Sequence, residues 1–283
     1  MRFLTLSSAI SHFTEEGPLP VVDLPDLALL TISGRFNHAI SLINHLKIPP
    51  SCGIRFRLVR RRSSDGLDLD GPKLLSFLSQ QLTHWPQDHA DRYLQAKVLS
   101  GNRIHFGNSK RIGQILDMSD SDEVEAHSRS SKDAMLSLVL TLNSSENTFA
   151  FFNELLELYS VTFSTTASLD LWLDQEFVDI ATAGGSFISF DTFHSFTNLK
   201  TLQLLDQSPV YLLPLFQNSS RSDHPLFPAL QSLCLAAYTG DGQSTLCTAL
   251  VAFLLWRIKV QAPVQEMNDM PIFKPSVFNL LSK

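Results

Sequence analysis

A short apolar pattern recurs along the chain: an apolar residue, two variable residues, an apolar residue, one variable residue and a third apolar residue. The best copies lie at residues 27–32, 199–204 and 230–235, and weaker copies lie at 1–6 and 158–163. Because side chains alternate between the two faces of a strand, the last two apolar residues of each copy point the same way. A strand this short cannot bury that face alone, so it needs a strand on each side and a helix behind it.

The gaps between these copies contain apolar residues at helical spacing, often bounded by proline or glycine. Helices are expected at residues 37–47, 72–86, 149–156, 172–180 and 244–263. Strands and helices should therefore alternate along most of the chain.

Three further segments alternate in the manner of strands without showing the full pattern. In residues 54–58 apolar residues alternate with arginines, and in residues 136–140 leucines alternate with small or apolar residues. Residues 94–106 are expected to be extended and to form a hairpin that turns at Gly101-Asn102. Alternating strands and helices favour parallel strands joined by right-handed crossovers. The predicted fold is α/β: a leucine-rich-repeat-like solenoid in which parallel strands alternate with helices.

One segment near the middle of the chain does not fit the repeat. Residues 117–133 are rich in serine and acidic residues, with little to bury, and are expected to form a flexible insertion. This divides the chain into an amino-terminal part of the solenoid, residues 1–116, and a carboxy-terminal part, residues 134–283. Whether the two parts stack continuously is left open, as is phosphorylation of the insertion.

Composition narrows the class of protein. Of the 283 residues 44% are hydrophobic, which is enough for a large core, yet no apolar run approaches the roughly 20 residues of a membrane helix. The net charge of −6 argues against general binding to nucleic acid or anionic membranes. Three widely spaced cysteines fit a reducing compartment, and hence a cytoplasmic or nuclear protein.

No motif in the chain predicts catalysis. A phosphate-binding glycine loop, a nucleophile elbow and a zinc-protease helix are all missing from the sequence. The two weak chemical signals are read as solvated surface: the basic run 60–62 and a possible metal-binding group. That group consists of His84, Asp88, His89 and Asp91. We therefore expect no catalytic residue, no metal site and no cofactor.

The strand alternation predicts a binding surface instead. Residues between the apolar positions should project from the sheet face that the helices leave uncovered, and these residues are mostly small and polar. The expected partner-binding residues are Thr5, Thr31, Lys200, Thr201, Gln203, Gln231, Ser232 and Cys234.

Several phrases resemble one known family. Residues 24–34, followed by a predicted helix and then by residues 46–51, resemble the repeat region of the large fungal family of F-box-like proteins with degenerate leucine-rich repeats. Residues 196–204, 227–235 and 254–257 are similar to the distal part of the same proteins. The resemblance implies repeats that bind a protein to be ubiquitinated, and an amino-terminal F-box that docks on the adaptor of a ubiquitin ligase.

The chain departs from that family at two points. No F-box is visible before the first repeat, and the asparagine slot of regular repeats holds Gln207 in one copy and Tyr238 in another. The expected function is a non-catalytic protein-interaction scaffold, with the ligase adaptor as a further partner where an F-box lies upstream. Two alternatives stay open: an enzyme with a scattered site that draws on two or more of His84, His89, Asp91 and His105, and a truncated product without independent activity.

Overall fold

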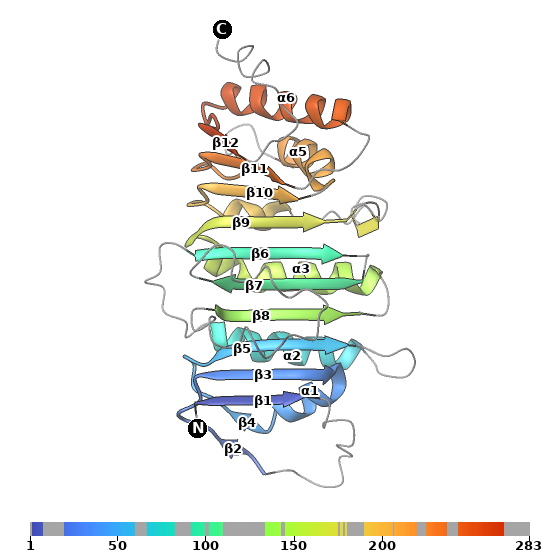
Figure 1. Ribbon diagram of the computed structural model, residues 1–283, viewed down its shortest axis with the longest axis vertical. Helices are drawn as coiled ribbons and strands as arrows, with labels where there is room; N and C mark the ends of the chain where they lie inside the picture. Colours follow the sequence, from blue (N-terminus) through green and yellow to red (C-terminus); the bar gives the residue numbers. More distant parts are fainter. Residues whose placement is uncertain are drawn as a thin grey trace.

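The computed structural model describes most of the chain, and everything below concerns those residues. They are 2–7, 20–59, 67–82, 92–99, 102–109, 134–142, 145–174, 176–177, 179, 190–205, 207–219, 225–236 and 243–268. They form a mixed α/β fold in which one long open sheet runs from one end of the described part to the other, with β1 as its first strand and β12 as its last (Figure 1).

The large sheet has ten described strands in the order β1-β3-β5-β8-β7-β6-β9-β10-β11-β12. A separate parallel pair, β2 (Val22–Asp23) with β4 (Leu46–Lys47), lies beside its first strands. The strands of the large sheet are β1 (Phe3–Ser7), β3 (Leu29–Arg35), β5 (Gly53–Val59), β6 (Arg92–Leu99), β7 (Arg103–Ser109), β8 (Ala134–Thr141), β9 (Thr166–Leu173), β10 (Thr201–Leu205), β11 (Ser232–Ala236) and β12 (Glu266–Asn268).

Nine of these ten described strands run in one direction. The exception is β7, which is antiparallel to β6 and to β8. The hairpin expected around residues 94–106 is confirmed, because β6 and β7 pair antiparallel with Leu99 opposite Arg103. Gly101, in the turn that was expected, lies outside the described residues. The prediction of parallel strands that alternate with helices is therefore confirmed for most of the sheet and is wrong at β7.

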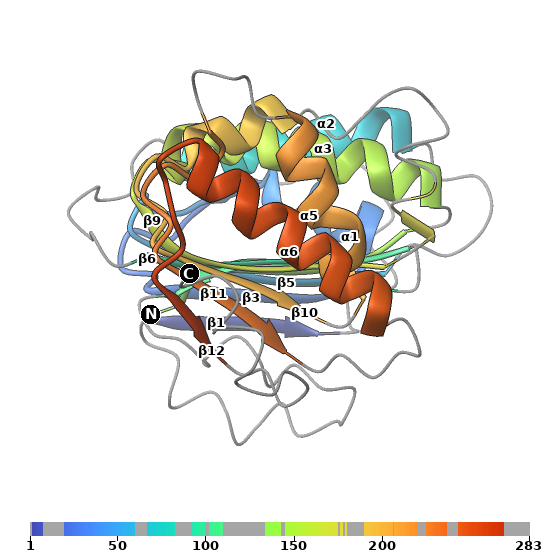
Figure 2. The same cartoon turned by 90° about the horizontal axis from the view of Figure 1, so that it is seen from above.

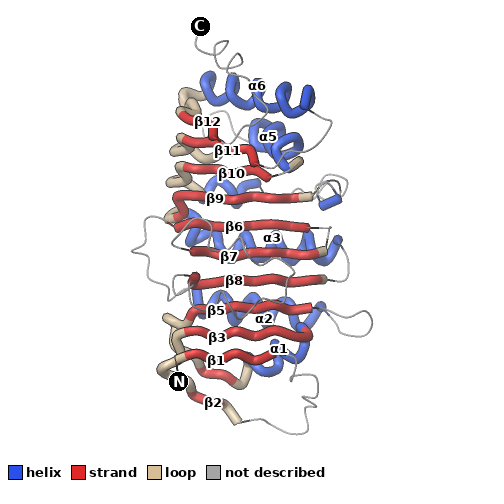
Figure 3. The backbone as a smooth tube through the Cα atoms, in the orientation of Figure 1, coloured by secondary structure: helices blue, strands red, loops and turns tan. Residues whose placement is uncertain are grey.

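The order of the strands is sequential at both ends of the sheet but not in its centre (Figure 3). After β5 the chain passes through a helix to β6, returns in β7, and then inserts β8 between β7 and β5. A second helix carries it from β8 past β7 and β6 to β9. The parts expected at 1–116 and 134–283 thus share one continuous sheet, and the insertion expected at 117–133 lies outside the described residues.

All of the described helices cover the same face of the sheet (Figure 2). Along the row α1 packs beside α2, α2 beside α3, and α5 beside α6. The helices are α1 (Phe36–Ile43), α2 (Leu67–Leu82), α3 (Ser145–Phe163), α5 (Ser208–Ser219) and α6 (Gln243–Lys259), with a 3-10 helix at η3 (Phe190–Ser195). None of the described helices has the length and apolar character needed to cross a membrane.

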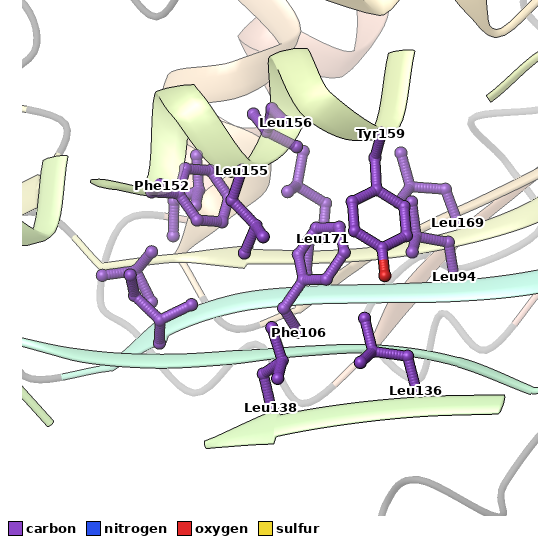
Figure 4. Close-up of a cluster of buried hydrophobic side chains, with 14 of the residues drawn as sticks. Leu94, Phe106, Leu136, Leu138, Phe152, Leu155, Leu156, Tyr159, Leu169 and Leu171 are labelled. Carbon is purple, nitrogen blue, oxygen red and sulfur yellow. The ribbon is translucent and has the colours of Figure 1, made fainter. Parts of the chain in front are cut away.

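The core lies between these helices and the sheet. Figure 4 shows Phe152, Leu155, Leu156 and Tyr159 pointing from α3 toward leucines and Phe106 of the central strands. The ring of Tyr159 meets that of Phe106 edge-on, with their centroids 4.6 Å apart. In the three best copies of the strand pattern the apolar positions, such as Leu30, Leu202 and Leu233, are all buried here, whereas Leu4 and Leu6 of the copy at 1–6 are partly buried.

Phenylalanine fills the space between the sheet and the carboxy-terminal helices. Phe193, Phe196, Phe216 and Phe227 are each at most 1% exposed and pack with their ring centroids 5.2 to 6.0 Å apart. Four of these pairs meet edge-on and the pair of Phe193 with Phe196 is stacked, arrangements that stabilise the core beyond the burial of apolar area. This explains why a chain with four Tyr has twenty Phe: these rings bury area without a hydroxyl group that needs a partner.

Two of the expected elements are wrong. The weak copy of the pattern at 158–163 belongs to α3, because Leu155, Leu156 and Tyr159 are buried at helical spacing on a helix that begins at Ser145. The start of the helix expected at 172–180 belongs to β9, where apolar residues alternate with Asp170 and Trp172. Apolar residues repeat every 3.6 residues along the helix α3 and every second residue along the strand β9, and in both segments this longer pattern decides the structure.

Candidate functional site

The face of the sheet that carries none of the described helices, which we call the front face, faces the viewer in Figure 1. It consists of the strand residues that alternate with the buried apolar ones. The strand register joins one complete row across it: Thr5, Thr31, Arg55, Ser137, Gly107, Gln95, Asp170, Gln203, Cys234 and Asn268.

The expected binding residues lie in two groups on this face. Thr5 and Thr31 are neighbours on β1 and β3, whereas Gln203 and Cys234 are neighbours on β10 and β11. Thr5 is exposed, Thr31 and Gln203 are partly exposed, and Cys234 is buried. The groups are six strand spacings apart, which is roughly 29 Å. The structure therefore places them in one row but does not bring them together.

The flanking residues of the prediction lie at the start of β10 and β11. Thr201 pairs with Ser232 on the front face, one step along the strands from Gln203. Lys200 and Gln231 precede the strands and are exposed, and the Lys200 carbonyl accepts the backbone N–H groups of Gln231 and Ser232 at 2.9 Å. These two backbone hydrogen bonds keep the first residues of β10 and β11 in register.

Between the two groups lies a buried polar pair that the sequence analysis missed. Tyr93 on β6 donates its hydroxyl hydrogen to a carboxylate oxygen of Asp170 on β9. The two side chains are 3% and 1% exposed. Burial disfavours the charged form of a carboxyl group and raises the pKa of Asp170 to about 7. Asp170 can therefore gain or lose a proton near neutral pH.

Gln95 and Lys97 lie next to this pair on β6. Gln95 is opposite Asp170 and only 1% exposed, and its amide nitrogen has no hydrogen-bond partner. Lys97 is 7% exposed, and its ammonium group lies 5.5 Å from the centre of the Trp172 ring, within cation–π range. Burial lowers the pKa of Lys97, and among the described residues it forms no salt bridge.

Basic side chains also gather on the central strands of the front face. Arg55 and Arg57 project from β5, and Arg103 and His105 from β7, on either side of β8. None of the residues of β5, β6, β7 and β8 is Asp or Glu. The charged side chains that β5, β6, β7 and β8 present on the front face are thus all basic, although the chain as a whole is negatively charged.

The sequence does contain a signal for the residues that were missed. On β6 the polar residues Tyr93, Gln95 and Lys97 alternate with apolar ones, but the segment was expected only to form part of a hairpin, and its two faces were not assigned. Asp170 was missed because Trp172 was assigned to a helical stripe. A strand with a two-residue period over residues 166–173 places Asp170 and Trp172 on the same face of the sheet.

The described residues hold no cluster suited to a metal ion. No three His, Cys, Asp or Glu side chains come together among them. The group His84, Asp88, His89 and Asp91 and the basic run 60–62 lie outside the described residues. His105 is on the front face in β7, opposite Lys97.

Comparisons with protein-family models, with curated proteins and with solved structures found no match to this chain. The site is therefore interpreted from its own geometry. Its central features are a continuous row of mostly polar residues, basic side chains on the central strands and a buried carboxyl, Asp170, whose pKa burial raises to about 7.

Proposed function

We propose that the protein is a non-catalytic interaction scaffold, an irregular leucine-rich-repeat-like solenoid whose front face recognises a partner protein. The observation that carries this proposal is the unbroken row of front-face residues, which crosses ten strands while every described helix packs on the other side. A long sheet face of polar, mostly short side chains suits recognition of a protein surface.

The competing proposal, an enzyme, draws on Asp170. A carboxyl with a pKa near 7 is typical of general acid–base catalysis. The same value follows from burial alone, however, and the 1% exposure of Asp170 gives a substrate no direct access to its oxygen atoms. The scaffold is therefore the better supported proposal.

The resemblance to fungal F-box-like proteins extends the proposal to the substrate-recognition region of a ubiquitin ligase subunit. This extension depends on an F-box joined to the chain. Recovery of the ligase adaptor with the product of the full transcript would support it, and failure to recover the adaptor would remove it.

Charged substitutions at the two ends of the row should weaken partner capture without unfolding the protein. Thr31→Glu places a carboxylate opposite Arg55, and Gln203→Lys places an ammonium group opposite Asp170, so both changes are compatible with the sheet. We expect each to reduce capture about tenfold or more if it lies in the contact, with stability changed by about 0.5 kcal/mol or less.

The measurement compares the proteins that the wild type and each variant recover from native extract, together with thermal unfolding. Glu157→Lys, an exposed charge change on α3, is the matched control. Partners lost from both front-face variants and retained by the control support the proposal. Equal recovery by all four proteins would contradict it, and unfolding of the front-face variants would mean that the faces are assigned the wrong way round.

A further inference from the structure

The two outermost strands of the large sheet differ in character. At one end β12 has three residues and carries the exposed side chain of Glu266. At the other end β1 has five residues, Phe3–Ser7, none of which is charged or proline. Natural proteins protect exposed sheet edges with short strands, charges or proline. The edge of β12 is protected in this way, whereas the outer edge of β1, with which no described strand pairs, is not.

The apolar side chains of β1 are covered less completely than those of the strand beside it. Leu30 and Ile32 on β3 are fully buried, at 0% exposure. Leu4 and Leu6, their partners on β1, pack against the core but remain partly exposed. Phe3 is 56% exposed. A further strand at this edge would bury apolar area that β3 and the helices leave open, which is favourable.

Two more apolar side chains are exposed at the same end of the sheet. Val21 is 66% exposed, and Val22 on β2 is 46% exposed. The strand β2 lies beside the first strands of the large sheet (Figure 1). With Phe3, these residues make up three of the six large apolar side chains that are well exposed in the described part of the chain. Exposed apolar groups that concentrate in this way are typical of an interaction surface.

The backbone of β1 shows which of its polar groups face outward. The carbonyl of Arg2 accepts the backbone N–H of Leu29 at 3.2 Å, so it points toward β3. The carbonyl groups of successive residues along a strand point to opposite edges. The N–H and C=O groups of Phe3, Thr5 and Ser7 therefore point away from β3. These are the groups with which a further strand would form hydrogen bonds.

The outward groups are arranged symmetrically about Thr5, so β1 is complementary to a second copy of itself. In an antiparallel pair of two β1 strands centred on Thr5, Thr5 faces Thr5 and Phe3 faces Ser7 of the other copy. Each facing pair can exchange two backbone hydrogen bonds, because both of its residues present N–H and C=O to the outer edge. Leu4 then faces Leu6 of the other copy on the helix side of the sheet, where the two side chains cover each other.

We propose that the outer edge of β1 is a dimerisation surface, at which two copies of this chain pair antiparallel about Thr5 and join their sheets into one. A two-fold axis perpendicular to the sheet relates the copies, so the helices of both lie on the same side. A strand of five residues offers a small interface, so the association is weak and depends on protein concentration. The proposal goes beyond the scaffold function and does not depend on it, since it concerns the edge of the sheet and not its front face.

A head-to-tail contact between β1 and the β12 strand of another copy fits these observations less well. It would pair a strand of five residues with one of three, and it would place the exposed Glu266 beside an uncharged strand. Such a contact is also open, so it would produce filaments of increasing length and not a dimer.

Sedimentation velocity of the full chain, over concentrations from about 1 to 300 μM, tests the proposal. We expect a monomer–dimer equilibrium without larger species. Thr5→Pro removes an N–H that the second copy needs and that β3 does not use, so it should weaken dimerisation about tenfold or more. Thr5→Lys should also weaken it about tenfold or more, because it places like charges opposite each other at the two-fold axis. Leu255→Lys, at a residue of α6 that is 53% exposed, is the matched control and should leave the equilibrium unchanged.

Three results would overturn the proposal. The first is a protein that stays monomeric over the whole range. The second is dimers that persist in the Thr5 variants, with circular dichroism unchanged, and their loss in Leu255→Lys would assign the contact to α6. The third is species that grow beyond the dimer as concentration rises, which would indicate the head-to-tail contact. Thr5→Lys, at an exposed position, decides the outcome if Thr5→Pro does not fold.

Discussion

An Arg257→Ala protein is expected to lose about 3 kcal/mol or more of its free energy of unfolding, one of the two largest effects we predict. Arg257 on α6 is fully buried, at 0% exposure, and no carboxylate pairs with it among the described residues. Its guanidinium instead donates to the backbone carbonyls of Leu226 at 2.9 Å, Phe227 at 3.1 Å and Leu230 at 3.4 Å.

These hydrogen bonds hold the segment that leads into β11. Within it Phe227 has a φ of 54°, in the left-handed region that a bulky residue adopts only when its surroundings fix it. Burial lowers the pKa of Arg257 to about 10, so the group stays charged at neutral pH, and hydrogen bonds from a charged donor are the stronger kind. Removing the guanidinium takes this charged donor away from all three carbonyls, although the Phe227 carbonyl still accepts the backbone N–H of Leu230 at 3.0 Å, and it frees the Phe227 backbone to relax.

Urea unfolding of three variants checks this prediction. Arg257→Lys should lose less stability than Arg257→Ala, because an ammonium group keeps the charge but cannot reach three carbonyls at once. Lys259→Ala, an exposed change on the same helix, should alter stability by about 0.5 kcal/mol or less. A loss below about 1 kcal/mol for Arg257→Ala would show that water or other donors satisfy the carbonyls.

The second large effect is on the pH dependence of stability and comes from Asp170. Its pKa of about 7 in the folded state lies above the ordinary value of 3.8, so the folded protein holds this proton more tightly than the unfolded chain does. The contribution of Asp170 is therefore most favourable below about pH 4, declines as the pH rises to about 7, and is constant above that. Over this window the decline amounts to at most about 4 kcal/mol.

Asp170→Asn should remove this decline. An amide oxygen still accepts the hydroxyl hydrogen of Tyr93 and carries no charge, so the variant should be more stable than the wild type above pH 7 and similar to it near pH 4. Tyr93→Phe should shift the decline to higher pH, because the ionised carboxylate loses its donor. Urea unfolding across the window measures both curves.

Asp26→Asn provides the control, since Asp26 is an exposed aspartate near the other end of the sheet. Its stability should follow the pH dependence of the wild type. If the free energy of unfolding changed with pH in the same way for the wild type and Asp170→Asn, the pKa of Asp170 would be the same in the folded and the unfolded protein, and the prediction would be wrong.

Local pattern was sufficient to predict most of the strands and helices. In β3, β10 and β11 the repeated leucines placed Leu30, Leu202 and Leu233 on the buried side, because alternation along a strand is a property of the strand itself. The local pattern failed at residues 158–163, where the apolar residues fit both the two-residue period of a strand and the 3.6-residue period of a helix. There the longer stripe on α3 decides, since it aligns Leu155 and Tyr159 with the sheet.

The centre of the sheet could not have been predicted in the same way. Sequence proximity suggested that each strand follows the last, yet β8 pairs with β5, whose last residue is separated from Ala134 by two strands and a helix. That pairing depends on contacts between segments far apart in the chain, and no single segment encodes it. The basic side chains of the central strands gather through this pairing, because β8 brings the arginines of β5 and β7 to either side of itself.

The late insertion of β8 also has a consequence for how the protein is made. As the chain emerges from the ribosome, β5 and β7 are complete well before residues 134–141 exist, and each then has one backbone edge whose N–H and C=O groups lack a neighbour. Such edges attract strands of other molecules. Nascent chains that stall before this point are the ones most exposed to aggregation, and synthesis of a single eight-residue strand closes both edges together.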